Sequence, residues 1–234
     1  MKFGLILAGQ YLRDAPPALR AGEMLEQVRL ARDLGFDSVW MVHHYLIEFQ
    51  TFQPLPMLAR IAADAGDMAI GTAIYVLPLQ HPVEVAENFA TLDALSGGRL
   101  IFGVAQGYRD AEFQALGIPR KERAARFEEG LALITRLWTE EHVTFHGRYY
   151  QVDGVTLAMA PARKPRPPIW IGAGADAAIA RGPARRRLDD RPRRRLRHRP
   201  EAARALPGDP ERPRSLDGAG IPDLPRGRRV SKRG

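Results

Sequence analysis

The sequence predicts an α/β protein in which a parallel sheet carries helices outside it. Short apolar runs rich in β-branched and aromatic residues alternate with amphipathic stretches of helical period. This order repeats four times before a fifth apolar run, and the first three amphipathic stretches end at a glycine or at Ser-Gly-Gly, which stop helices. Barrels and doubly wound sheets both have this alternation, so these observations alone favour neither.

Each expected element has a local reason. Leu25, Val28, Ala31 and Leu34 recur about every turn of the first helix, and Gly35 caps it. The expected strands cover residues 1–8, 35–45, 68–77, 100–105 and 169–171. The expected helices cover residues 19–34, 55–65, 82–95 and 122–139, with a loop over 106–119 and an outer hairpin over 143–152.

Prolines and small turns set the remaining boundaries. Pro78 closes the third strand because it cannot continue a ladder, and Pro82 suits the first turn of the third helix. The hairpin turns at His146-Gly147-Arg148. The fifth strand follows a proline-rich stretch and leads into Gly172-Ala173-Gly174, where the next helix is expected to open.

Composition narrows the class of protein. The chain has 234 residues and no cysteine, which excludes disulfides and thiolate metal sites. No apolar run approaches the roughly 20 residues of a membrane span, and residues 1–8 are too short for a signal peptide. We therefore expect a cytoplasmic protein without a membrane partner.

The charge divides the chain into two parts. Residues 181–234 contain 18 Lys/Arg, 7 Asp/Glu, eight prolines and no Phe, Tyr, Trp or Met. Such a segment cannot bury enough apolar surface to offset chain entropy, so disorder is expected there. The domain prediction is a folded portion over residues 1–180 and an Arg/Pro-rich tail over residues 181–234.

The best candidate for chemistry is the pair His43 and His44. Both follow the second apolar run, and barrel enzymes place their sites at the carboxyl ends of such strands. An ordinary imidazole pKa near 6.5 suits acid–base work at neutral pH. Surface loop histidines are the competing interpretation.

Four stretches together carry a resemblance. They are Met1-Lys2-Phe3-Gly4, Gly35-Phe36-Asp37 with His43-His44, residues 71–78 followed by His81-Pro82, and residues 92–99 leading into Phe102-Gly103-Val104. In this order and spacing they resemble the bacterial luciferase-like family of flavin-dependent monooxygenases and oxidoreductases, over residues 1 to about 180. The resemblance implies a (β/α)8 TIM barrel, which in this chain would be incomplete, with about five βα units.

The resemblance also implies a cofactor, reduced FMN or in some branches a deazaflavin, bound at the carboxyl ends of the strands. A monooxygenase acting with oxygen on a small organic substrate is expected, with a flavin reductase as the source of reduced flavin. A deazaflavin-dependent hydride transfer is the alternative. Homodimers are common in the family.

The resemblance implies roles for individual residues. His44 matches the histidine that serves the flavin as hydrogen-bond partner or acid/base, whereas His43 replaces a carboxylate and is expected to be an exposed neighbour. Ala73-Ile74 matches a bulge with a non-prolyl cis peptide that supports the flavin ring. These are the catalytic and ring-binding candidates.

The flavin phosphate has its own candidates. Gln106 stands where luciferases place an arginine, so it can donate hydrogen bonds but brings no positive charge. Gly172 and Gly174 match the backbone half of the phosphate site at a helix start. Tyr108 and Arg109 are looser candidates for the same site.

The tail has a second explanation. Written in GC-rich codons and shifted by one base, Gly182 to Arg191 permits a sequence close to what the family carries after its fifth strand. We hypothesise that residues 181–234 are an out-of-frame translation, which the nucleotide sequence tests.

Three functional alternatives stay open. A metal-dependent hydrolase would use His43, His44, Glu48 and His81, although adjacent strand residues point to opposite faces and rarely share an ion. Nucleic-acid binding through the basic tail is a weaker alternative, and no metal site is expected. An inactive remnant without the last barrel strands is the third.

Overall fold

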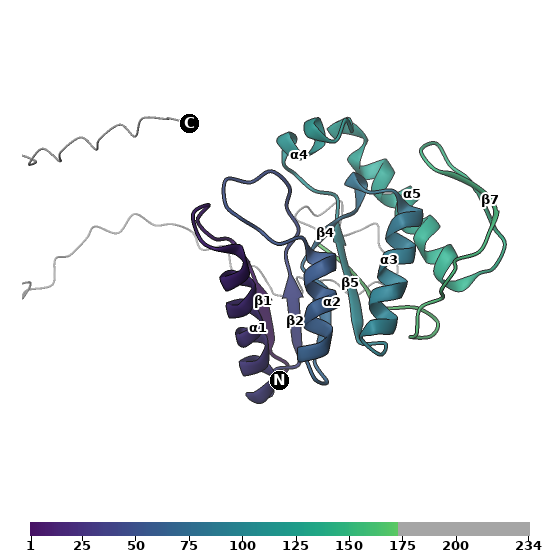
Figure 1. The fold of residues 1–234 in the computed structure, drawn as a ribbon. Coiled ribbons are helices and arrows are strands. Elements are labelled where there is room, and N and C mark those ends of the chain that lie inside the picture. Colours follow the sequence, from purple (N-terminus) through teal and green to yellow (C-terminus); the bar gives the residue numbers. More distant parts are fainter. Residues whose placement is uncertain (173–234) are drawn as a thin grey trace, which may run out of the picture. The chain divides into compact units, whose positions relative to one another are not determined.

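The computed structural model describes residues 1–172, which lie within the first of the two compact units of the chain, Met1–Arg191 (Figure 1). The predictions for residues 181–234 and for Gly174 lie outside the described residues. The strands are β1 Gly4–Leu7, β2 Ser38–Met41, β3 Ala69–Thr72, β4 Tyr75–Val76, β5 Leu100–Ala105, β6 Val143–His146, β7 Gln151–Val155 and β8 Ile169–Ile171.

Five α-helices and two 3₁₀ turns connect these strands in the described part of the chain. They are α1 Pro17–Asp33, α2 Pro54–Asp64, α3 Pro82–Leu95, α4 Asp110–Ala115 and α5 Arg123–Thr139, with η1 Leu77–Leu79 and η2 Arg120–Glu122. No helix among residues 1–172 is long and apolar enough to cross a membrane.

Six strands form one parallel sheet, in which β1 pairs with β2, β2 with β3, and β3 with β5. β4 also pairs with β5, and Val104 is paired with Tyr75 on one side and with Ile171 of β8 on the other. β3 and β4 therefore occupy the same side of β5 and are two pieces of one barrel strand. Spatial order follows chain order, as in a (β/α)8 barrel.

A bulge separates β3 from β4. Gly71 is paired with Ile101, and Tyr75 is paired with Val104. The segment from β3 to β4 therefore contains one more residue between these two pairs than β5 does. The Ala73–Ile74 peptide within the bulge is cis. The bulge and the cis peptide that the resemblance implied are both present.

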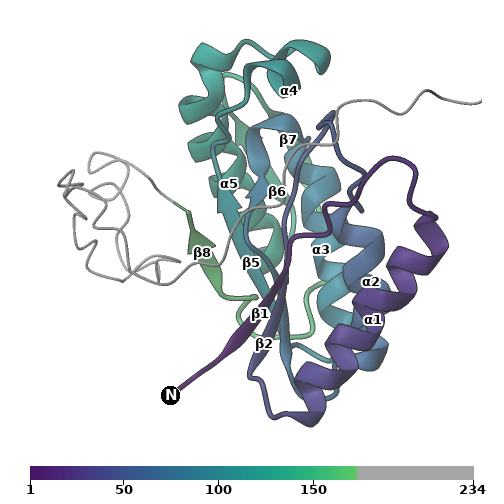
Figure 2. The same ribbon diagram turned by 90° about the vertical axis from the view of Figure 1, so that its left-hand side faces the viewer.

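Helices cover one face of the sheet. α1, α2, α3 and α5 lie side by side in that order across the sheet in Figure 1, and Figure 2 shows α1 and α2 on the opposite side from the open face of β1. The core between the layers is formed by outward-facing strand residues and by apolar helix residues, among them Ile70, Phe102, Leu58, Phe89 and Ile134, each fully buried.

The structure corrects two local predictions. The loop expected over residues 106–119 contains α4, a six-residue helix that begins at Asp110. Leu34 is not on the buried face of α1, because the helix ends at Asp33 and the Leu34 side chain is 67% exposed. The hairpin is confirmed as β6 and β7, extended to Val155.

Candidate active site

The end of β2 separates its two histidines. β2 ends at Met41, and His43 then lies on the helix side of the sheet, where it is 2% exposed. The His44 side chain is 21% exposed and faces α4 instead. This difference agrees with the alternation of successive side chains in extended chain.

His43 belongs to the protein interior. Its Nδ1 accepts a hydrogen bond from the backbone N–H of Val76 at 3.1 Å, and its ring stacks on Tyr75 with centroids 4.3 Å apart. Burial, helped by the neighbouring His44, lowers the pKa of His43 to about 4. The prediction of an exposed neighbour is wrong, because a neutral imidazole is small and apolar enough to pack where its backbone donor is supplied.

His44 is held by a buried carboxylate. Its Nδ1 lies 3.2 Å from Oε1 of Glu112, and the same oxygen accepts a hydrogen bond from the backbone N–H of Tyr45 at 3.0 Å. Glu112 is 1% exposed, and Nε of Arg109 lies 3.8 Å from its Oε1. Gln53 fixes the backbone by donating to the His44 carbonyl at 3.0 Å.

Glu112 is the functional candidate that the sequence analysis missed. It lies on α4, inside the segment expected to be a loop. Phe113 and Leu116, three residues apart, are a weak signal for that helix, and Phe113 is indeed buried. No local pattern, however, links Glu112 to a histidine 68 residues earlier.

The ring-binding candidates Ala73 and Ile74 lie between β3 and β4, and Gly172 directly follows β8. Ala73 donates its backbone N–H to the carbonyl of Met41 at 2.8 Å, which ties the bulge to the end of β2. A Cβ on Gly172 would lie 2.9 Å from Cγ2 of Ile74 and 3.5 Å from Cβ of Ala105, so Gly172 packs closely against these two side chains.

The other candidates follow β5. Gln106 comes directly after this strand and is partly exposed. The Tyr108 side chain is 68% exposed, and its ring lies edge-on to His44 with centroids 6.4 Å apart. Arg109 lies near Glu112, the residue that contacts His44, with Nε 3.8 Å from Oε1 of Glu112. Gly174 lies outside the described residues.

Two tryptophans fill the open face of the sheet below these positions. The rings of Trp40 and Trp170 lie 4.9 Å apart, and Nε1 of Trp40 donates to Oγ of Ser38 at 2.9 Å. A Cβ on Gly71 would lie 2.6 Å from the Trp40 ring, so glycine is required beside it.

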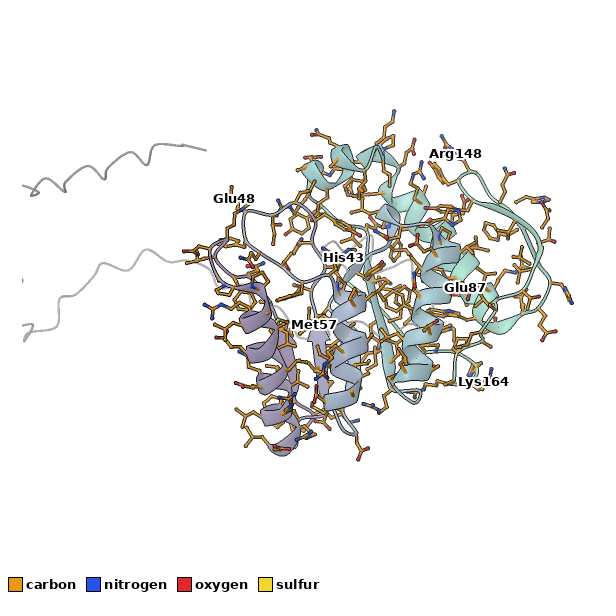
Figure 3. All side chains as sticks on the ribbon, viewed as in Figure 1. His43, Glu48, Met57, Glu87, Arg148 and Lys164 are labelled. Atoms are coloured by element: carbon orange, nitrogen blue, oxygen red, sulfur yellow. The ribbon has the colours of Figure 1, made fainter. Side chains whose placement is uncertain are left out.

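The residues of the metal-hydrolase alternative do not gather. Figure 3 shows Glu48 on the outer part of the loop after β2, well apart from His43. Within residues 1–172, no group of three or more His, Asp or Glu residues could hold a metal ion.

Comparison with known proteins identifies the family to which the chain belongs. The family model described as luciferase-like monooxygenase matches residues 1–185. The chain belongs to the luciferase-like monooxygenase family. The family recognised from the motifs and its TIM-barrel fold class are thereby confirmed.

Two relatives represent the chemistry found in this luciferase-like family. The chain is 31% identical over 178 residues to the flavin-dependent trigonelline monooxygenase, oxygenase component, of Acinetobacter baylyi, covering 74% of this chain and 49% of the relative. It is 35% identical over 162 residues to the F420-dependent glucose-6-phosphate dehydrogenase of Intrasporangium calvum, covering 65% of this chain and 48% of that relative. The family therefore contains both flavin- and F420-dependent oxidoreductases.

A solved structure agrees in fold and sequence. The monooxygenase RslO1 from Streptomyces bottropensis matches with a TM-score of 0.73 and 32% identity, covering 77% of this chain and 56% of RslO1. The chain spans about half the length of the curated relatives that it matches.

Proposed function

We propose that the protein is a flavin-dependent monooxygenase that uses reduced FMN and oxygen on a small organic substrate. The observation that carries this proposal is the placement of His44. It is partly exposed, held by Glu112, and follows the carboxyl end of β2, to which Ala73 is tied by its hydrogen bond to the carbonyl of Met41. The named relative that is flavin-dependent supports the same assignment.

We assign the flavin ring to the strand ends at Ala73, Ile74 and Gly172. Ala73, Ile74 and Gly172 are partly exposed, whereas Thr72 and Phe102, on the helix side, are buried. Because Gly172 lacks a side chain, the backbone directly after β8 can lie against the Ile74 side chain. In this proposal Ala73 and Ile74 support one side of the ring.

The phosphate end is assigned to Gln106, Gly172 and Gly174. An amide side chain and backbone N–H groups can bind an anion by hydrogen bonds without a charged partner. Bound reduced flavin would supply the electrons that activate oxygen.

His44 has the proton-transfer role in the proposal. Within residues 1–172 its Nε2 has no hydrogen-bond partner, so this nitrogen is available to a bound ligand. A positioned imidazole that accepts or donates a proton there would serve as general acid or base. Tyr108, beside it, would help to exclude water.

The source of reduced flavin is proposed to be a separate reductase, because the Acinetobacter relative is named an oxygenase component. A homodimer and a cytoplasmic location stay predictions from the sequence analysis.

A second candidate function is a deazaflavin-dependent hydride transfer. The F420-dependent relative supports it at an identity similar to that of the monooxygenase. It would use the same strand ends and the same histidine, but would not consume oxygen.

One experiment tests both candidates. The purified chain is titrated with FMN, reduced FMN and F420, with flavin fluorescence and oxygen uptake as readouts and far-UV circular dichroism as the folding control. Binding of reduced FMN with oxygen uptake above that of free flavin supports the monooxygenase, whereas binding of F420 alone supports hydride transfer. A folded chain that binds none of them would leave the inactive remnant as the better account.

A further inference from the structure

The environment of His44 specifies more than its position. Oε1 of Glu112 lies 3.2 Å from Nδ1 of His44 and accepts the backbone N–H of Tyr45 at 3.0 Å. Glu112 is 1% exposed, so water cannot readily replace either partner, and losing one would leave a buried polar group unpaired at a cost in free energy. One buried oxygen atom thus binds two adjacent residues of the loop after β2.

The hydrogen bonds at Oε1 of Glu112 decide which group donates. This oxygen already accepts the Tyr45 N–H at 3.0 Å, and Nε of Arg109, which can only donate, lies 3.8 Å from it. An unprotonated Nδ1 at 3.2 Å would place two lone pairs against each other, whereas an Nδ1–H donates to the oxygen. Nδ1 of His44 must therefore carry the hydrogen, and the neutral ring has its lone pair on Nε2.

We infer that Glu112 is a positioning residue that holds His44 in the Nδ1–H tautomer and presents an unprotonated Nε2 to the open side of the site. Gln53 fixes the backbone of His44 from α2's start, and the Tyr108 ring borders the imidazole edge-on. The catalytic use of Nε2 as a base rests on the proposed function, whereas the tautomer itself does not.

His43 provides a control within the same molecule. Its Nδ1 accepts the backbone N–H of Val76, so a neutral His43 carries its hydrogen on Nε2. Two adjacent histidines are therefore expected in opposite tautomers, each set by the hydrogen bond at Nδ1. Any general perturbation of the fold would alter both.

The test is nitrogen-15 NMR of histidine-labelled full-length chain without flavin, at about pH 9, well above the ordinary imidazole pKa of about 6.5. Long-range proton–nitrogen spectra distinguish a protonated from an unprotonated ring nitrogen. The ring-nitrogen signals that disappear in His44→Gln belong to His44, and those that disappear in His43→Gln belong to His43. Wild type should show Nδ1–H for His44 and Nε2–H for His43.

Two variants at position 112 complete the test. Glu112→Gln keeps an oxygen where Tyr45 N–H needs an acceptor, so His44 should retain Nδ1–H. Glu112→Ala removes the acceptor, and Nε2 of His44 should change from unprotonated to protonated while the His43 pattern stays. An Nε2–H pattern for His44 in wild type, or an unchanged Nδ1–H pattern in Glu112→Ala, would overturn the inference.

The outcome does not depend on cofactor binding. Should Glu112→Ala fail to fold, wild type and Glu112→Gln still decide, because Nε2–H in either overturns the inference. Failure of the flavin titration would remove the proposed function and leave the tautomer result intact.

Discussion

The two faces of the parallel sheet carry different kinds of side chain. The face under the helices is built from large apolar residues such as Phe102 and Ile70, both fully buried. The open face carries glycines, alanines, Ile101 and the tryptophan pair, and its strand ends are partly exposed. Packing against helices requires volume on the first face, and a ligand would require space on the second.

His43 and His44 show what this difference does to one residue type. His43, on the helix side, is buried and has a lowered pKa, whereas His44, one residue later, is partly exposed and bound to a carboxylate. Side chain chemistry alone does not assign a role to a histidine. The role of each histidine is set by the face of the sheet on which it lies and by its hydrogen-bond partner there.

The largest expected effect is on the open face. His44→Ala should lower turnover by about 100- to 10,000-fold, the usual range for losing a general acid or base, while the Kd for FMN stays nearly unchanged. Steady-state oxygen uptake and flavin fluorescence titration measure the two quantities. Normal turnover in His44→Ala would remove this residue from the mechanism.

A pair of variants on β5 compares the two faces by stability. Phe102→Ala should lower the free energy of unfolding by about 3–5 kcal/mol, because it removes a fully buried ring from the helix layer. Ile101→Ala, on the open face and partly exposed, should cost less, under about 2 kcal/mol. Urea denaturation measures both, and equal losses would contradict the assignment of the faces.

The last expected effect concerns stability in acid. The folded pKa of His43 is lowered from 6.5 to about 4, so the unfolded chain binds the proton more readily between these values. The free energy of unfolding should therefore fall as the pH drops from 6.5 to 4, by up to about 3 kcal/mol from this residue.

His43→Phe tests this pH dependence. It should be less stable at pH 7, because the Val76 N–H loses its acceptor, yet its stability should fall less steeply between pH 6.5 and 4. His81→Gln, at an exposed position, is the matched control and should retain the wild-type slope. An unaltered slope in His43→Phe would show that His43 is not the group that titrates.

Periodicity was sufficient for most elements. The helix over 82–95 and the strand over 100–105 are found with the predicted bounds, because Pro82 and Ser96-Gly97-Gly98 mark the helix ends locally. The six-residue α4 was missed, since a helix of fewer than two turns leaves little periodic signal and depends on Phe113 packing against Val76 and Leu79.

The sequence by itself determined the βα order, the outward-facing apolar residues, the family and the position of the histidine pair. These follow from local patterns, in which each residue acts through neighbours a few positions away. Only the tertiary structure decided that His43 is interior and that His44 meets Glu112. Both depend on contacts with β4 and α4, brought to the end of β2 by strand pairing and helix packing across tens of residues.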